Sequence, residues 1–333
     1  MLYFTASPRL CGEKKSGSKL TTHNLKPTTL IIFTPMKYPL SLLLSLITLT
    51  IMAQSNDAYS AEIDKWVEGR YKDLKAEDGW LNLAGLFWLN PGENSFGNNA
   101  VAAIAVTHPN MPVNAGTFIL KGKEVVWKSA KGVLVTKNQN TPVDNEVIFH
   151  SDSTKNPTLR MGQFLFTVIK RADKIGIRFR DTNSAALLTF KKIQRFPTDI
   201  SWNIPATLEP SLVKTIEITN VLGQTGPQPS PGKLVFTVKG VTYKLAAIDE
   251  GGDELFVIFG DATSGNETYP AGRFVYVKKP DANGKTFIDF NKAFNPPCAF
   301  TDFATCPLPP AQNRLSLPIT AGEKTFHPLT TIY

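Results

Sequence analysis

The feature that most constrains this chain is a series of short stretches with alternating apolar residues, each bounded by turn-forming residues. They lie at 80–89, 117–120, 125–127, 163–170, 174–180, 213–219, 233–239, 241–248, 254–259, 273–277 and 286–290. A period of two is typical of strands with one buried face. Because Gly, Pro, Asn and Asp separate the stretches, the pattern favours a sandwich or barrel over alternating strands and helices. We therefore expect an all-β fold.

One helix is expected before the strands, over residues 56–79. Apolar residues recur there at three- and four-residue steps between Tyr59 and Leu74, and Gly79 is placed to end the helix. Polar residues near 181–200 then interrupt the strand series. We expect a small, accessory β-sandwich over 80–182 and a larger sandwich or jelly-roll-like module over 185–333. From Phe290 onward the second module is expected to be mostly irregular and rich in proline.

Residues 36–55 have the composition of a secretory signal peptide. Lys37 precedes an apolar run of about a dozen residues, and small residues follow at Ala53 and Ser55. We expect cleavage near Ser55 and a periplasmic or secreted protein; the alternative is an uncleaved leader that anchors the chain, the one expected contact with a membrane. Because Met36 fits as a start codon, residues 1–35 are interpreted as a misannotated or disordered extension.

The charge distribution argues against a nucleic-acid partner. The chain has a formal net charge of +8, but residues 1–55 carry +5 of it. The remaining 278 residues hold 30 basic and 27 acidic side chains without a basic run. A phosphate-binding surface needs clustered positive charge. We expect no nucleic acid among the partners.

Two of the three cysteines remain once the predicted leader is removed. Cys298 and Cys306 are an even pair in an oxidising compartment, which predicts a disulfide that clamps the proline-rich stretch around it. The alternative is a metal site made by Cys298, Cys306 and His327, although the spacing lacks the short knuckle of structural zinc sites. No cofactor is expected otherwise.

A dense run of polar residues, 261–273, joins two of the expected strands. The chain contains no G-x-S-x-G, H-E-x-x-H, G-x-x-x-x-G-K or G-x-G-x-x-G motif, so no familiar catalytic signature competes with this run. Arg273 could hold a carboxylate or phosphate through two parallel hydrogen bonds. The candidate ligand-binding residues are Thr268, Tyr269, Arg273, Asp289, Asn291, Asn295 and Asn313.

Three interpretations of this polar region stay open. The first is an exported module that binds a small polar or anionic ligand such as a sugar or carboxylate. The second is a hydrolase or lyase, with or without the help of a metal ion, in which Asp261 or Glu323 is the general acid or base and Arg273 stabilises negative charge. The third is structural: turn-capping residues and an internal ion pair of Arg273 with Asp289 or Glu323 that ties the C-terminal stretch to the sheet.

Several longer motifs resemble the bacterial and haloarchaeal family known as domain of unknown function 1684. They are D-A-T-S-G-N-E-T-Y-P-A-G-R-F from Asp261, D-F-N-K-A-F-N-P-P-C-A-F from Asp289, T-C-P-L-P-P-A-Q-N-R-L from Thr305 and A-G-E-K from Ala321. The stretch from Asp78, D-G-W-L-N-L-A-G-L-F-W-L, is similar to longer members. The resemblance implies that about 185–327 is the self-sufficient part; it implies no activity.

Overall fold

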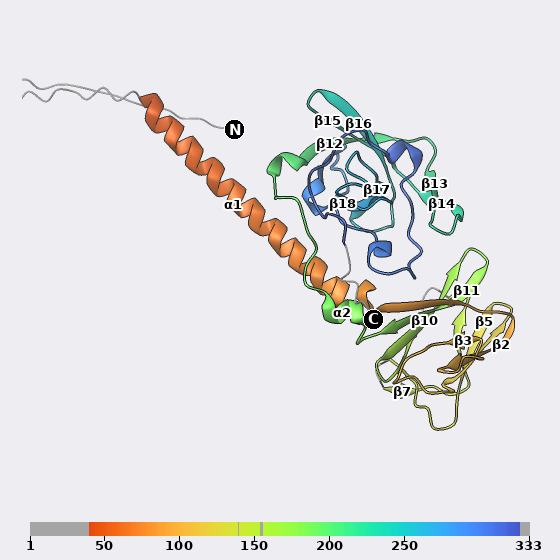
Figure 1. The fold of residues 1–333 in the computed structure, drawn as a ribbon. Coiled ribbons are helices and arrows are strands. Elements are labelled where there is room, and N and C mark those ends of the chain that lie inside the picture. The colour runs from red at the N-terminus through yellow and green to blue at the C-terminus, as the bar shows by residue number, and fades with distance from the viewer. Residues whose placement is uncertain (1–39, 139, 154–155, 327–333) are drawn as a thin grey trace, which may run out of the picture. The chain divides into compact units, whose positions relative to one another are not determined.

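Most of the regular structure in this chain is β-strand, arranged in several sheets and preceded by one long helix (Figure 1). The computed structural model describes residues 40–326 apart from 139 and 154–155. The expected all-β class is confirmed. Residues Ile51–Tyr333 form one compact unit. The predicted extension 1–35 lies outside the described residues, and the predicted boundary near 181–200 stays a prediction.

Helix α1 (Leu40–Lys75) is longer at its start and shorter at its end than the helix predicted over 56–79. It ends at Lys75 because the chain turns there: the Gly79 amide donates to the Ala76 carbonyl at 2.7 Å. A Cβ at Gly79 would lie 2.4 Å from the Leu74 carbonyl oxygen, so the turn requires glycine. Within the part of the chain described, no helix is both long and apolar enough to cross a bilayer.

Two sheets in residues 83–181 share one hydrophobic core. Their strand orders are β1-β11-β10-β9-β6-β7 and β3-β2-β4-β5-β8. The strands are β1 (Leu83–Trp88), β2 (Gly92–Gly97), β3 (Ile104–Ala105), β4 (Gly116–Lys121), β5 (Glu124–Ser129), β6 (Thr136–Lys137), β7 (Thr141–Pro142), β8 (Glu146–His150), β9 (Thr158–Met161), β10 (Phe164–Arg171) and β11 (Lys174–Asp181). Phe96, Phe118, Trp127 and Phe166 pack together in this core with edge-on or tilted rings. The predicted stretches 117–120 and 125–127 lie in the antiparallel pair β4–β5, and 163–170 and 174–180 correspond to the antiparallel pair β10–β11.

The second core lies within residues 204–321 and is built on a four-stranded sheet of order β16-β15-β12-β19 and the strand pair β17–β18. The hairpin β13–β14 packs in a separate cluster through Ile216 and Ile218. Short helix α2 (Ala185–Thr189) precedes them. The strands are β12 (Asn203–Pro210), β13 (Thr215–Thr219), β14 (Thr225–Pro229), β15 (Gly232–Val238), β16 (Val241–Ala247), β17 (Glu254–Phe259), β18 (Arg273–Lys278) and β19 (Lys285–Asp289). An isolated bridge from Ile248 to Phe256 connects β16 to β17.

Residues 290–326, which we call the tail, contain only short 3-10 turns, as their composition predicted. The tail is nevertheless well packed. Ile319 and Ala321 have no exposed surface and belong to the second core. Phe300 joins a separate apolar cluster with Leu74 of α1 and Phe190. The tail therefore depends on side-chain packing and hydrogen bonds for its position, since it has no ladder of its own.

Candidate functional site

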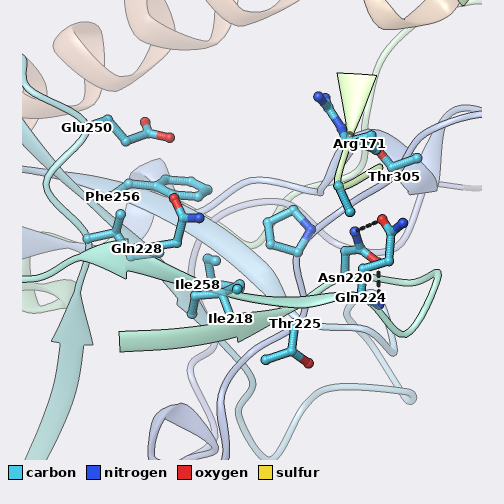
Figure 2. A pocket seen from close by; sticks show the side chains of 14 residues that line it. Arg171, Ile218, Asn220, Gln224, Thr225, Gln228, Glu250, Phe256, Ile258 and Thr305 are labelled. Atoms are coloured by element: carbon cyan, nitrogen blue, oxygen red, sulfur yellow. Dashed lines mark hydrogen bonds between the residues drawn. The ribbon is translucent and has the colours of Figure 1, made fainter. Parts of the chain in front are cut away.

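An open cavity of about 580 Å³ lies beside the β13–β14 hairpin; we call it the hairpin cavity (Figure 2). Its apolar lining comes from Ile218 of β13, from Phe256 and Ile258 of β17, and from Ile248, which form one cluster. Its polar lining is made by Arg171, Asn220, Gln224, Thr225, Gln228, Glu250 and Thr305. None of the ligand-binding residues predicted from the sequence lines it.

The turn of the hairpin is fixed by Asn220. Its side-chain oxygen accepts from the amides of Leu222 at 2.9 Å and Gln224 at 3.2 Å, and its side-chain amide donates to Gln224 Oε1 at 3.0 Å. Gly223 at this turn has φ +75°, a conformation that favours glycine. The tail pairs alongside: the Val221 amide donates to the Cys306 carbonyl at 2.9 Å. The cavity wall is therefore built from both the hairpin and the tail.

Two charged groups approach the rim of the cavity. Arg171 Nε donates to Thr305 Oγ1 at 3.1 Å and Nη1 donates to the Lys170 carbonyl at 2.9 Å. Nη2 has no partner among the described residues. Glu250 accepts from the Tyr276 hydroxyl at 3.3 Å. Burial, together with the charge of Glu250, raises the pKa of Tyr276 to about 12.

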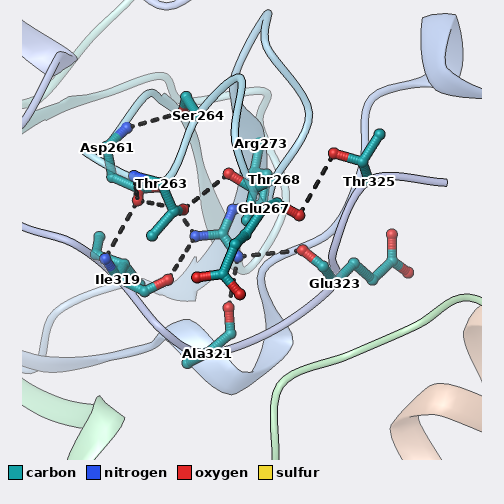
Figure 3. A network of polar contacts seen from close by, with 10 residues as sticks. All are labelled: Asp261, Thr263, Ser264, Glu267, Thr268, Arg273, Ile319, Ala321, Glu323 and Thr325. Atoms are coloured by element: carbon teal, nitrogen blue, oxygen red, sulfur yellow. Dashed lines mark hydrogen bonds and ion pairs between the residues drawn. The ribbon is translucent and has the colours of Figure 1, made fainter.

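The predicted site centred on Arg273 is closed instead of open (Figure 3). Arg273, the first residue of β18, has no exposed surface. Its Nη2 donates to Asp261 Oδ2 and to the Ile319 carbonyl, both at 2.9 Å. Its Nη1 donates to the carbonyls of Ala321 and Glu323. Burial lowers the pKa of the Arg273 guanidinium, and the adjacent Asp261 carboxylate opposes that effect.

Both carboxylate oxygens of Asp261 already accept hydrogen bonds from the protein. Its Oδ1 accepts from the Thr263 amide at 2.9 Å, the Thr263 hydroxyl at 2.6 Å and the Ile319 amide at 3.2 Å. The hydroxyls of Thr263 and Thr268 lie 2.9 Å apart. We expected an ion pair of Arg273 with Asp289 or Glu323, and that prediction is wrong: Arg273 pairs with Asp261. The reason is that the loop 261–272 folds back and brings Asp261 to the guanidinium.

Glu323 lies in a second buried cluster. Its Oε2 accepts from the Asn295 amide at 2.6 Å, and its Oε1 lies 3.4 Å from Arg70 Nε of α1. Gly322, at φ +76°, makes the turn that places it, and a Cβ there would lie 2.5 Å from the Ala293 carbonyl oxygen. The Glu323 side chain therefore does not reach Arg273; only its backbone carbonyl does.

Helix α1 also contacts the predicted residues Asp289 and Asn291. The Tyr59 hydroxyl donates to Asp289 Oδ1 at 2.7 Å and accepts from Asn291 Nδ2 at 2.9 Å. Burial and the bond to Asp289 raise the pKa of Tyr59 far above its ordinary value. Asn291 further binds the backbone of Asp199 through both ends of its amide. These side chains hold α1 and the tail together.

The remaining predicted ligand-binding residues have separate structural partners. Asn295 Nδ2 donates to the Lys324 carbonyl at 2.8 Å, while its buried Oδ1 has no partner among the described residues. Asn313 accepts from the Ala246 amide at 2.7 Å and donates to the carbonyls of Ala246 and Ile258. Tyr269 donates to the Cys298 carbonyl at 3.1 Å, and burial raises its pKa. The structure thus does not gather the predicted residues around one cavity.

Cys298 and Cys306 are adjacent free thiols, so the structure does not show the predicted disulfide. The Cys298 amide donates to Cys306 Sγ at 3.0 Å. Hydrogen bonding from the Cys306 thiol lowers the pKa of Cys298 to about 7, and the same contact raises the pKa of Cys306. His327, the third residue of the alternative metal site, lies outside the described residues. Among residues 40–326 as described, no group of three or more His, Cys, Asp or Glu could hold a metal ion.

The sequence did not identify the hairpin cavity because its polar residues carry no motif. Strand β14 reads T-G-P-Q-P and shows no apolar alternation. The available signal was the turn Asn220 to Gly223, whose Asn and Gly are typical of a hairpin between two short strands.

Comparison with known proteins found a family match for one part of the chain. Residues 188–324 match the family described as "Protein of unknown function (DUF1684)". A search of curated proteins found no match. Among solved structures, the chain is similar to a solution NMR structure of an uncharacterized protein from Haloarcula marismortui, at 28% identity over 41% of this chain and 77% of that chain, with a TM-score of 0.35. The resemblance read from the motifs is confirmed over residues 188–324.

Proposed function

Because residues 188–324 match a family of unknown function, we propose a function from the geometry: the chain is an exported binding protein that holds a small polar ligand in the hairpin cavity. The observation that carries the proposal is the composition of this cavity. An apolar floor and several polar groups on the rim are typical of small-molecule sites, whose volumes run from about 300 to 1,000 Å³.

The polar groups favour a hydroxylated ligand such as a sugar or sugar acid. The Gln228 side chain makes no hydrogen bond with the described residues, and the residue is exposed. Its side-chain amide can therefore both donate to and accept from hydroxyls. Figure 2 shows it beside Phe256, which offers a flat apolar surface. A carboxylate on the ligand would meet the unpartnered Nη2 of Arg171.

The alternative hydrolase or lyase is less well supported. Asp261 and Glu323 are buried, and each of their carboxylate oxygens already accepts a hydrogen bond from the protein. Neither residue lines the hairpin cavity. A general acid or base must come within hydrogen-bond reach of its substrate. Either carboxylate would therefore have to break several internal bonds before it could act.

Export is the second half of the proposal and depends on residues 36–55. Their composition, one lysine followed by an apolar run and small residues, is that of a cleavable leader. An exported protein meets nutrients and envelope saccharides, which are compounds of the kind that the hairpin cavity fits.

The test is a binding measurement on residues 56–333 with defined sugars. We would titrate glucose, galactose, N-acetylglucosamine and glucuronate while recording NMR signals of the side-chain amides. Saturable shifts at Asn220, Gln224 and Gln228 are expected, and Gln228→Ala should weaken binding about tenfold, the effect of one hydrogen bond. Gln312→Ala is the matched control because Gln312 is exposed and does not line the cavity. Equal weakening by both variants, or shifts confined to other residues, would contradict the proposal.

A further inference from the structure

Two arginines lie side by side on the outer face of β11. Ile175, Ile177 and Phe179 of this strand point into the first core. Because side chains alternate along a strand, Arg178 and Arg180 lie together on the opposite face. In the antiparallel ladder Arg178 is opposite Leu86 of β1 and Thr167 of β10, so the sheet's own register gives it no acidic neighbour.

Within the part of the chain that the structure describes, neither guanidinium has an anionic partner, and the contact that Arg178 makes is with the Trp80 ring. Among the described residues, no side-chain hydrogen bond or ion pair is made by Arg178 or Arg180. The Nε atoms of both are buried and unbonded. Arg180 is only 7% exposed. Buried charges in proteins are normally paired, since an unpaired one is strongly unfavourable.

Burial and neighbouring positive charges disfavour the charged form of Arg178. Arg178 lies 5.2 Å from the centre of the Trp80 ring. Burial, together with the charges of Arg180 and Arg171, lowers the pKa of Arg178 to about 10. The carboxylate that acts on Arg180 is Asp78, which is exposed and does not form an ion pair with it. By contrast Arg160, on the same face in β9, is paired with Glu77.

We propose that Arg178 and Arg180 form an oxyanion-binding site on the outer face of β11, and that its ligand is a phosphate group. Unlike the Nε atoms, their Nη atoms are not fully buried. Two planar guanidinium forks match the oxygens of a phosphate. Trp80 provides a flat wall beside Arg178. Neither arginine lines the hairpin cavity.

The experiment measures phosphate binding to residues 56–333 by calorimetry and by thermal unfolding, with sodium chloride at equal ionic strength as the reference. Inorganic phosphate is the probe, and phenyl phosphate in a second arm distinguishes a free anion from a phosphomonoester. Phosphate is expected to bind saturably and to raise Tm. Arg180→Gln and Arg178→Gln should each weaken binding about ten- to a hundredfold, because each removes charge-assisted hydrogen bonds.

Two further variants distinguish phosphate binding by Arg178 and Arg180 from a purely structural role of these arginines. Arg160→Gln, on the same face but already ion-paired, should leave phosphate binding unchanged. Asp78→Asn should tighten it, since Asp78 is a carboxylate whose negative charge acts on Arg180. If phosphate acts no differently from chloride, or if Arg160→Gln weakens binding as much as Arg180→Gln, the site is disproved. Loss of stability in Asp78→Asn without any phosphate effect would show that Asp78 is the partner of Arg180.

Discussion

At the scale of single residues, the Arg273 guanidinium holds the tail. It donates to one carboxylate and to three tail carbonyls, of Ile319, Ala321 and Glu323. The planar fork of arginine can serve several fixed acceptors at once, which a lysine ammonium cannot do in the same geometry. Its role in this structure is to position the tail, and any ligand role would require the tail to leave.

Replacing Arg273 should therefore destabilise the fold. Arg273→Met leaves Asp261 buried without its counter-charge and leaves three carbonyls unbonded. We expect a loss of about 3–5 kcal/mol in the free energy of unfolding, measured by urea titration. Arg314→Met is the control, because Arg314 is exposed and should change stability by less than about 0.5 kcal/mol. A similar small change in Arg273→Met would show that the buried pair contributes little.

The thiol of Cys298 should titrate near neutral pH in the reduced protein. Hydrogen bonding from Cys306 lowers the pKa of Cys298 to about 7, so the thiol is protonated and slow to react below that pH. The alkylation rate with iodoacetamide should rise through pH 7 and then level off. In Cys306→Ala the midpoint should move up toward about 8.5, the ordinary value of a free thiol. An unchanged midpoint would mean that Cys306 does not stabilise the thiolate.

At the scale of elements, the tail is held by side-chain bonds to strands that lie far from it in sequence. Asn313, which is 1% exposed, bonds to both backbone groups of Ala246 in β16 and to the Ile258 carbonyl of β17. An asparagine can do this because its amide combines an acceptor with two donors. The Asn313 side chain thus connects β16 to β17 through hydrogen bonds to their backbones.

Asn313→Leu should remove that connection while keeping a similar volume. Buried backbone groups of Ala246 and Ile258 would lose their partner, which costs about 1–3 kcal/mol for each unsatisfied group. We expect faster hydrogen exchange at the Ala246 amide and lower stability in urea. Exchange that stays as slow as in the natural chain would show that another group replaces the asparagine.

Helix α1 should depend on Tyr59 for its attachment to the tail. Tyr59→Phe keeps the ring but removes the hydroxyl that bonds to Asp289 and Asn291. The expected loss is about 1–2 kcal/mol, in proportion to two hydrogen bonds. Tyr243→Phe, whose hydroxyl makes no bond with the described residues, is the control.

At the scale of the whole molecule, the export hypothesis makes a prediction that one mass measurement can check. Expressed with its leader in an exporting host, the protein should begin near residue 56. Its mass should be about 2 Da below that of the reduced chain, since an oxidising compartment favours the Cys298–Cys306 disulfide. A retained leader, or two thiols that a reagent labels without prior reduction, would contradict this expectation.

The sequence by itself determined the features that are local. Alternation over a few residues predicted the strands that pair as β4–β5 and β10–β11, and composition predicted an irregular tail. These predictions succeeded because side-chain direction along a strand repeats every two residues whatever the rest of the chain does. Strand β12 was missed because Pro205 and Pro210 interrupt its pattern, and it is stabilised by pairing with β15 and β19 from distant parts of the chain.

Only the tertiary structure decided which groups meet. The sequence analysis expected Arg273 to pair with Asp289 or Glu323, but the fold pairs it with Asp261. Glu323 faces Arg70 and Asp289 faces Tyr59. The sequence analysis likewise did not predict the hairpin cavity or the two arginines of β11 that lack an ion pair. The physical reason is that partnership between charges depends on distance and burial in three dimensions, which no residue type or spacing encodes.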